Sequence, residues 1–200
     1  MSKARIAVLV SGGGTNLQAL IDAQASGSIR SGEIVLVISN NAIAYALQRA
    51  ANAGIDTAVV LKKQLGSQLA FEQRIMELLA QNKIDLIVLA GFMSILSEQF
   101  TSAYPKRILN VHPSLIPSFC GEGFYGLRVH EEALRYGVKV TGATVHYVNE
   151  IPDGGEIIYQ KAVEIQPGDT PEILQRRVME QAEWKILPAA VETVSKQLMG

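Results

Sequence analysis

The chain has 200 residues, with 18 lysines and arginines against 19 aspartates and glutamates, so its formal net charge is -1. This length is ordinary for one α/β domain with a single core, and the balanced charge lacks the basic excess of a nucleic-acid-binding surface. Cys120 is the only cysteine, which excludes an intrachain disulfide and favours a reducing compartment. No apolar run reaches the roughly 18 residues of a membrane span, and the segment before Ile6 is too short for a signal peptide. We therefore expect a cytoplasmic protein with no membrane or nucleic-acid partner.

Apolar, β-prone runs alternate with amphipathic helical segments along the chain. We expect strands at residues 6–10, 34–39, 57–61, 86–90, 107–111, 139–147 and 156–163. We expect helices at residues 17–24, 44–53, 72–80, 131–136 and 170–194, the last with Thr170 as its N-cap and Pro171 at its first position. This alternation predicts an α/β fold with a doubly wound, mostly parallel sheet and a Rossmann-like N-terminal half.

The C-terminal part of the pattern differs from the rest. The last two expected strands are joined by a short turn at residues 149–155, so we expect them to pair antiparallel. Residues 113–127 form the longest irregular stretch, and loops of that length in a compact domain are often functional. We find no repeat and no linker, and we therefore expect one domain spanning residues 1–200.

A glycine-rich segment, residues 11–16, lies between the first expected strand and the first expected helix. Its three consecutive glycines let a ligand approach the backbone, and the free N–H groups at the start of a helix bind phosphate well. The alternative is a tight turn in which Thr15 or Asn16 caps the helix. Three glycines exceed what a turn requires, so the segment favours a phosphate site.

The same segment does not match the dinucleotide-binding fingerprint. The glycine expected three residues after Gly14 is replaced by Leu17, and Asn40 and Asn41 stand where an acidic residue would follow the second strand. No lysine follows the glycines as it does in a P-loop. A monophosphate therefore fits better than a dinucleotide or a triphosphate.

Polar side chains stand at the end of the expected strand 107–111. Asn110 and His112 are two residues apart and so share one face of the strand, and Pro113 ends the strand because it cannot donate to a ladder. Ligands of open parallel sheets bind at the carboxyl ends of the strands. An amide beside a titratable ring suits a reaction in which a carbonyl oxygen gains charge while a proton moves.

Each of these residues also has an ordinary structural interpretation. A histidine near a strand end is commonly a hydrogen-bonded structural residue, and an asparagine beside a turn often caps it. Asp153 lies in the tight turn at residues 151–155, where aspartate is favoured for the turn alone. A carboxylate on a separate segment, within plausible reach of Asn110 and His112, strengthens the catalytic interpretation.

An apolar segment at residues 89–97 ends a strand at the same sheet edge as Asn110. Gly91 lets backbone approach a ligand, and the large side chains around it could line a flat slot for an aromatic ring system: Phe92, Met93, Ile95 and Leu96. Ordinary core packing is the equally favoured alternative.

These segments together resemble the phosphoribosylglycinamide formyltransferases, a folate-dependent family of purine biosynthesis. The similarity runs from about Ile6 to Pro188 and rests on five segments in family order: residues 11–16, 89–93, 110–115, 144–146 and 153–155. The middle three are shared with a wider formyltransfer superfamily. The N-terminal glycine loop, together with Glu183 five residues before Pro188, points to this family.

The resemblance implies transfer of the formyl group of 10-formyltetrahydrofolate to the amine of glycinamide ribonucleotide, by direct attack through a tetrahedral intermediate. Asn110 and protonated His112 would hold the oxyanion, while Asp153 would raise the pKa of His112 and help move the proton. No metal is expected, because the three histidines do not have zinc-site spacing. The resemblance leaves a homodimer open.

The resemblance also implies where the two substrates bind. The phosphate-binding half would span residues 1–100 and the folate-binding and catalytic half residues 101–200. The phosphate and ribose would be held by Gly14, Thr15, Asn16 and Glu183. The folate slot would be formed, largely through backbone atoms, around Met93, Leu96 and Val148 up to Asp153. His146 would be a partner of the catalytic group and His130 a structural residue at a helix start.

Three positions depart from the family pattern. Ser94 and Gln68 stand where many relatives carry arginine, which puts side-chain contacts to the folate tail in doubt without affecting the chemistry. Trp184 replaces a histidine common after the ribose-binding glutamate, and we interpret it as a change of packing.

Three other functions are the alternatives. Methionyl-tRNA formyltransferase would need a tRNA-binding surface and typically a further C-terminal domain, whereas this chain is near neutral and stops at Gly200. Formyltetrahydrofolate hydrolase shares similar catalytic residues but usually follows an N-terminal regulatory domain. A non-catalytic nucleotide-binding module would keep the glycine loop without any reason for Asn110, His112 and Asp153 to converge.

Overall fold

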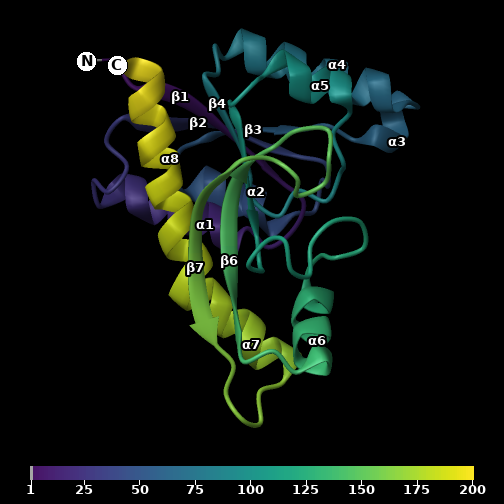
Figure 1. Cartoon of the computed structure of the whole chain (residues 1–200). Helices are drawn as coiled ribbons and strands as arrows, with labels where there is room; N and C mark the ends of the chain where they lie inside the picture. The colour runs from purple at the N-terminus through teal and green to yellow at the C-terminus, as the bar shows by residue number, and fades with distance from the viewer. Residues whose placement is uncertain (1) are drawn as a thin grey trace.

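The computed structural model describes residues 2–200, and its centre is a seven-stranded sheet in the order β3-β2-β1-β4-β5-β6-β7 (Figure 1). The strands are β1 (Ala4–Val10), β2 (Gly32–Ser39), β3 (Asp56–Val59), β4 (Leu86–Leu89), β5 (Ile108–His112), β6 (Val140–Tyr147) and β7 (Ile157–Glu164). Strands β1 to β5 pair parallel, and β6 pairs antiparallel with both β5 and β7. The expected α/β sheet, with a Rossmann-like N-terminal half and an antiparallel strand near the C-terminal end, is confirmed.

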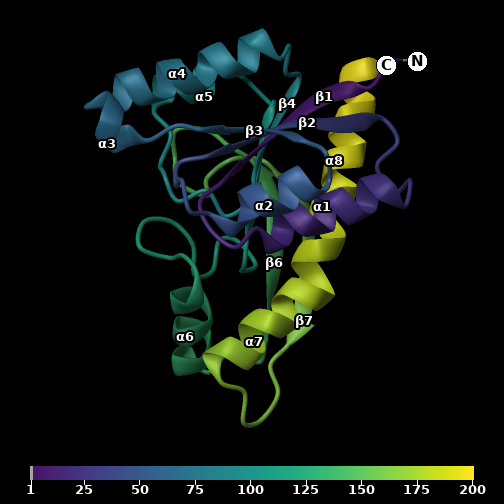
Figure 2. The same cartoon turned by 180° about the vertical axis from the view of Figure 1, so that it is seen from behind.

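Helices cover both faces of this sheet. They are α1 (Thr15–Ala25), α2 (Tyr45–Asn52), α3 (Lys62–Leu65), α4 (Gln68–Gln81), α5 (Glu98–Ala103), α6 (Leu127–Tyr136), α7 (Pro171–Val178) and α8 (Trp184–Met199), with a π-helical segment, η1 (Met179–Glu183), between the last two. Figure 2 shows α1, α2 and α8 together over one face, and α4 and α5 lie apart from them. Among residues 2–200, none of the helices combines the length and the apolar character that crossing a membrane requires.

The double covering follows from the apolar strands. Along β1, Ile6 and Val8 belong to the core beneath α1 and α8, whereas Ala7 and Leu9 belong to the core beneath α4 and α5. All of these side chains are fully buried. Successive strand residues point to opposite faces, so a continuous apolar run requires a helical layer on each side.

Two short helices, α3 and α5, were not expected from the sequence. They have four and six residues, too few to show a helical periodicity. A capping signal does mark α5, because the Ser97 hydroxyl accepts a hydrogen bond from the Phe100 N–H at 3.3 Å. Helix α4 begins at Gln68, four residues before the expected start, and Ser67 caps it in the same manner.

The expected C-terminal helix is continuous but contains a wider turn. Thr170 caps α7 and Pro171 is its first residue, as expected, and the π-helical segment η1 then ends at Glu183. Pro188 lies inside α8, and a proline in a helix interior clashes with the carbonyl group four residues earlier, here Trp184. The wider turn ends immediately before that residue. Widened turns of this kind often occur at functional sites.

The connection between β6 and β7 carries the expected carboxylate in a constrained turn. Asp153 has φ +56°, in the left-handed region that few residues other than glycine, asparagine and aspartate adopt. Gly155 lies so close to β6 that an added Cβ would collide with the Tyr147 carbonyl oxygen. The Tyr147 N–H donates to the Glu156 carbonyl at 2.9 Å and closes the turn. Glycine at position 155 is therefore what lets the turn fold back onto the strand.

We expect Gly155→Ala to destabilise the protein by about 1–3 kcal/mol, because the added methyl group forces the turn away from β6. Urea unfolding followed by circular dichroism measures this change. Gly13→Ala is the matched control, because an added Cβ there has no atom within 4 Å and φ lies outside the left-handed region. Equal stabilities of the two variants would contradict the role assigned to Gly155.

Candidate active site

A cavity of about 910 Å³ lies along the carboxyl ends of β1, β4 and β5. Six parts of the chain line it: residues 12–16, 90–95, 110–113, 121–126 with His130, 152–153, and Gln175 with Met179 and Glu183. The strand order reverses between β1 and β4, which lie side by side at the centre of the sheet. Ligands of open α/β sheets bind at such a reversal.

Asn110, His112 and Asp153 meet in this cavity. Asn110 and His112 come from the end of β5, and Asp153 comes from the turn after β6. The Asp153 Oδ2 atom lies 3.4 Å from His112 Nδ1, and its Oδ1 atom lies 3.5 Å from the Asn110 amide nitrogen. The structure thus brings Asp153 to the two side chains from which the sequence separates it by about forty residues.

His146 is the fourth member of this cluster. It lies opposite Asn110 in the β5–β6 pairing, and its Nδ1 atom lies 2.8 Å from the Tyr147 carbonyl oxygen. Because a carbonyl only accepts, Nδ1 carries the proton. In the neutral ring Nε2 then accepts from the Asn110 amide at 3.2 Å. It also lies 3.6 Å from Asp153 Oδ1. His146 therefore fixes the orientation of the Asn110 amide. This contact agrees with the expectation that His146 is a partner of the proposed catalytic residues.

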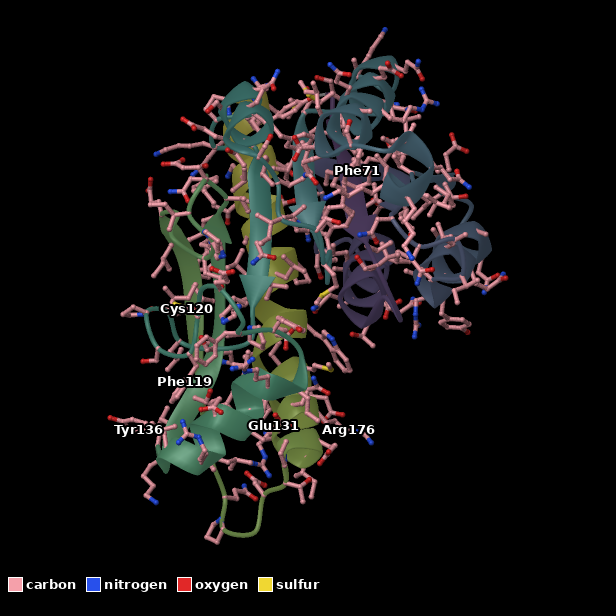
Figure 3. All side chains as sticks on the ribbon, turned by 90° about the vertical axis from the view of Figure 1, so that its right-hand side faces the viewer. Phe71, Phe119, Cys120, Glu131, Tyr136 and Arg176 are labelled. Carbon is pink, nitrogen blue, oxygen red and sulfur yellow. The ribbon has the colours of Figure 1, made fainter. Side chains whose placement is uncertain are left out.

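The loop between β5 and α6 covers the imidazole of His112. The Phe119 carbonyl oxygen lies 2.9 Å from His112 Nε2, and the Gly121 N–H donates to Asp153 Oδ2 at 2.9 Å. Phe119 also packs against Tyr136 of α6, with the ring centroids 6.0 Å apart. Figure 3 shows Phe119 near Tyr136 at one end of the molecule and Phe71 near the other. The loop is thereby held both at His112 and Asp153 and at α6.

These two loop contacts were not predicted residue by residue. Phe119 and Gly121 act through backbone atoms, which no side-chain motif reports, and only the length of the irregular stretch drew attention to it. Cys120 lies between them (Figure 3), and burial together with the Asp153 charge raises the pKa of its thiol. A raised pKa keeps the thiol protonated and unreactive, in agreement with its interpretation as a bystander.

Burial and charge act in opposite directions on His112 and Asp153. Burial lowers the pKa of His112 below its ordinary value, and the Asp153 carboxylate and the Phe119 carbonyl offset only part of this effect. Asp153 was expected to raise the pKa of His112; its contribution has that sign, but desolvation of the ring outweighs it. Burial raises the pKa of Asp153, yet the contacts with His146, His112 and Gly121 outweigh it and the pKa falls below its ordinary value.

The glycine-rich segment presents its N–H groups to the cavity. The carbonyl groups of Ser11, Gly12 and Gly13 accept hydrogen bonds from residues beyond β2, namely Asn41, Ala46 and Arg49. Gly14 is the N-cap of α1 with φ +72°, and no side chain caps the helix. The alternative of a Thr15 or Asn16 cap is therefore wrong. An uncapped helix start is suited to binding an anion.

Glu183 lies beside this segment. Its carboxylate accepts from the Asn16 side-chain amide at 2.8 Å, and the residue is only 5% exposed. Burial raises the pKa of Glu183 to about 7, with the Asn16 hydrogen bond acting in the opposite direction. The Asn16 Oδ1 atom and the Trp184 indole N–H are buried without a hydrogen-bond partner among residues 2–200. The Asn16 oxygen is therefore free to accept a hydrogen bond, and the Trp184 N–H is free to donate one.

The apolar residues assigned to a ring slot have different surroundings. Met93 is 56% exposed and lines the cavity with Phe92 and Ile95. Leu96 is buried beneath α4 and α5 and lines only a shallower neighbouring hollow with Lys62 and Gln68. Val148 packs against the same core and does not reach the cavity. The Leu96 and Val148 side chains do not line this cavity, and the assignment of a folate slot around them stays a prediction.

The chain resembles proteins of one family both in sequence and in structure. Residues 4–191 match the formyl transferase family model. The phosphoribosylglycinamide formyltransferase of Haemophilus influenzae is 45% identical over 94% of this chain and 85% of its own length. The glycinamide ribonucleotide transformylase 1 of Symbiobacterium toebii is 42% identical, with a TM-score of 0.91 over 98% of this chain and 89% of that one.

The trifunctional purine biosynthetic protein adenosine-3 of Gallus gallus is 46% identical over 97% of this chain. The chain spans only 19% of that longer relative. These matches agree with the sheet topology, the glycine segment and the cluster of Asn110, His112 and Asp153. The chain belongs to the formyl transferase family, among the phosphoribosylglycinamide formyltransferases.

Proposed function

We propose that this protein transfers the formyl group of 10-formyltetrahydrofolate to the amine of glycinamide ribonucleotide, a step of purine biosynthesis. The observation that supports this most directly is the meeting of Asn110, His112 and Asp153 in a cavity that also contains the uncapped start of α1. The names of the relatives support the same activity. Phosphate is bound by the N-terminal half, residues 1–100, and chemistry is carried out by the C-terminal half, residues 101–200.

The ribonucleotide is held at the glycine segment. The N–H groups of Gly14, Thr15 and Asn16 bind the phosphate, because the carbonyl groups of the preceding residues are turned toward α2 and do not repel it. The Glu183 carboxylate accepts from the ribose hydroxyl groups. This arrangement directs the glycinamide amine toward the end of β5.

Asn110 and His112 stabilise the charge that develops on the formyl oxygen. The amine nitrogen forms a bond to the formyl carbon, and the oxygen becomes an oxyanion. The Phe119 carbonyl oxygen, 2.9 Å from His112 Nε2, lies where His112 would donate to such an oxyanion. The oxyanion therefore replaces that carbonyl, and the Asn110 amide, oriented by His146, provides the second donor.

Asp153 stabilises the protonated ring and assists proton movement. Burial disfavours charge on His112, so protonation of the ring relies on the Asp153 carboxylate 3.4 Å away. When the bond from the formyl carbon to folate N10 breaks, the proton lost by the attacking amine is delivered to that nitrogen, through Asp153 or a water that it holds. The sum of these steps is formyl transfer with no net change in protons.

The formylfolate co-substrate fits the apolar side of the cavity. Phe92, Met93 and Ile95 provide a flat wall, and the backbone of the turn before Asp153 provides polar atoms for the pterin ring. Ser94 accepts a hydrogen bond from Asn40, and Gln68 donates to the Ile95 carbonyl. Neither supplies a cation, so side-chain attraction for the folate tail is weaker here than with arginine at these positions.

The direct test is to incubate the protein with both substrates and to detect formylated ribonucleotide by mass. We expect loss of formylfolate to require glycinamide ribonucleotide. Consumption of formylfolate in water alone would instead establish the hydrolase alternative.

We expect Asn110→Ala to reduce turnover by about 10²–10³, because one donor to the oxyanion is lost. Asp153→Asn should cause a loss of similar order, since the amide carries no charge to stabilise protonated His112. Turnover is measured by stopped assay, with circular dichroism to verify folding. Wild-type turnover in either folded variant would contradict the mechanism.

The raised pKa of Glu183 predicts a pH-dependent affinity for the ribonucleotide. Ribose hydroxyls donate to the ionised carboxylate, so binding lowers its pKa and releases a proton. Affinity should therefore rise as pH increases from 5 to 7. It should level off above the pKa of Glu183 in the ligand-free protein, which is about 7. Calorimetric titration measures this, and Glu183→Gln should remove that component while the contribution from the ligand phosphate remains. Identical pH profiles for both proteins would refute the assignment.

A further inference from the structure

His130 is a buried side chain that the proposed mechanism does not use. It lies in the first turn of α6 and has no solvent-exposed surface. Neither Nδ1 nor Nε2 has a hydrogen-bond partner among residues 2–200. From the sequence, His130 was expected to be a structural residue at a helix start, but a structural histidine in the interior is normally held by hydrogen bonds.

The ring borders the active-site cavity. It lines the cavity together with the loop at residues 121–126 and with Gln175 and Met179, and α6 packs against α7. It is also near enough to His112 for that ring to influence it electrostatically. A partner for the two nitrogens can therefore come from the cavity.

The ring is uncharged in its present surroundings. Burial, with a smaller effect of His112, lowers the pKa of His130 to about 4. A neutral imidazole has one N–H donor and one nitrogen acceptor. Such a group suits an uncharged amide, which offers both a carbonyl acceptor and an N–H donor, better than it suits a phosphate or a carboxylate.

We propose that His130 contacts the amide group of the glycinamide moiety of the amine substrate. This inference rests on the proposed function and assigns the part of the substrate between its two ends. The glycine segment and Glu183 account for the phosphate and the ribose, and Asn110 and His112 account for the formyl group. The amide between them has no other assigned partner, and His130 lines the same cavity as His112 and Glu183.

The contact requires a small shift of the ring or of the adjoining loop, because the ring borders the cavity without exposed surface. Gly123 and Gly126 of that loop both have positive φ. The substrate amide would then supply the partner that the buried nitrogens lack.

The test compares two ligands on the wild-type protein and two variants. Calorimetry measures the dissociation constants of glycinamide ribonucleotide and of ribose 5-phosphate, which lacks the amide, for wild type, His130→Phe and His130→Gln. We expect His130→Phe to weaken binding of glycinamide ribonucleotide roughly 5- to 100-fold, the effect of leaving a buried amide unpaired. Binding of ribose 5-phosphate should be unchanged. His130→Gln, which keeps a donor and an acceptor, should recover part of the loss, and His130→Leu serves if the Phe variant does not fold.

Stability gives an independent readout. Because the ring nitrogens are unpartnered, His130→Phe or His130→Leu should leave Tm equal to or above that of wild type. Thr141→Val is the matched control, since the Thr141 hydroxyl is likewise buried and unpartnered but does not line the cavity. It should alter neither dissociation constant.

Two outcomes would overturn the proposal. Equal weakening of both ligands would place His130 at the ribose phosphate, and no weakening of either with a lower Tm would make it a purely structural residue. Wild-type protein that transfers no formyl group would refute the proposed function instead, and the ligand comparison on His130 would still be readable.

Discussion

The Asp153 carboxylate is the group on which the rest of the site depends. It accepts from the Gly121 N–H and lies between His112 and His146, so it joins the end of β5, the end of β6 and the covering loop. Its own position requires a left-handed backbone and a glycine at 155. The turn, the antiparallel pairing of β6 and the loop contact are therefore parts of one constraint, which holds a negative charge beside a buried ring.

Burial makes charge costly throughout this cavity, and the fold uses that cost in two ways. At His112 it lowers the pKa, so that protonation depends on Asp153 and on the oxygen facing Nε2. At Glu183 it raises the pKa to about 7, so that ionisation depends on donors such as Asn16. The charge state of each group is thus set by its neighbours as well as by burial.

The sheet brings the glycine segment and the apolar wall together. The glycine segment follows β1 and the apolar wall follows β4, which are neighbours because the strand order reverses between them. The segment is kept open to an anion by hydrogen bonds that turn its carbonyl groups toward α2. Both the glycine segment and the apolar wall are therefore positioned by backbone geometry, and the side chains of Asn110, His112 and Asp153 line the same cavity.

The sequence alone determined the sheet class, the glycine segment, and the identities of Asn110, His112 and Asp153, because these depend on local patterns: apolar runs, spacing along a strand, and turn-forming residues. It could not show that burial would outweigh Asp153 in setting the pKa of His112. It could not show that Phe119 and Gly121 would contact His112 and Asp153 through backbone atoms. It also could not show that the C-terminal helix would widen at residues 179–183. Those features depend on desolvation and on packing between segments far apart in the chain. Only the tertiary structure decides them, because the environment of a charge is set by neighbours that sequence order does not specify.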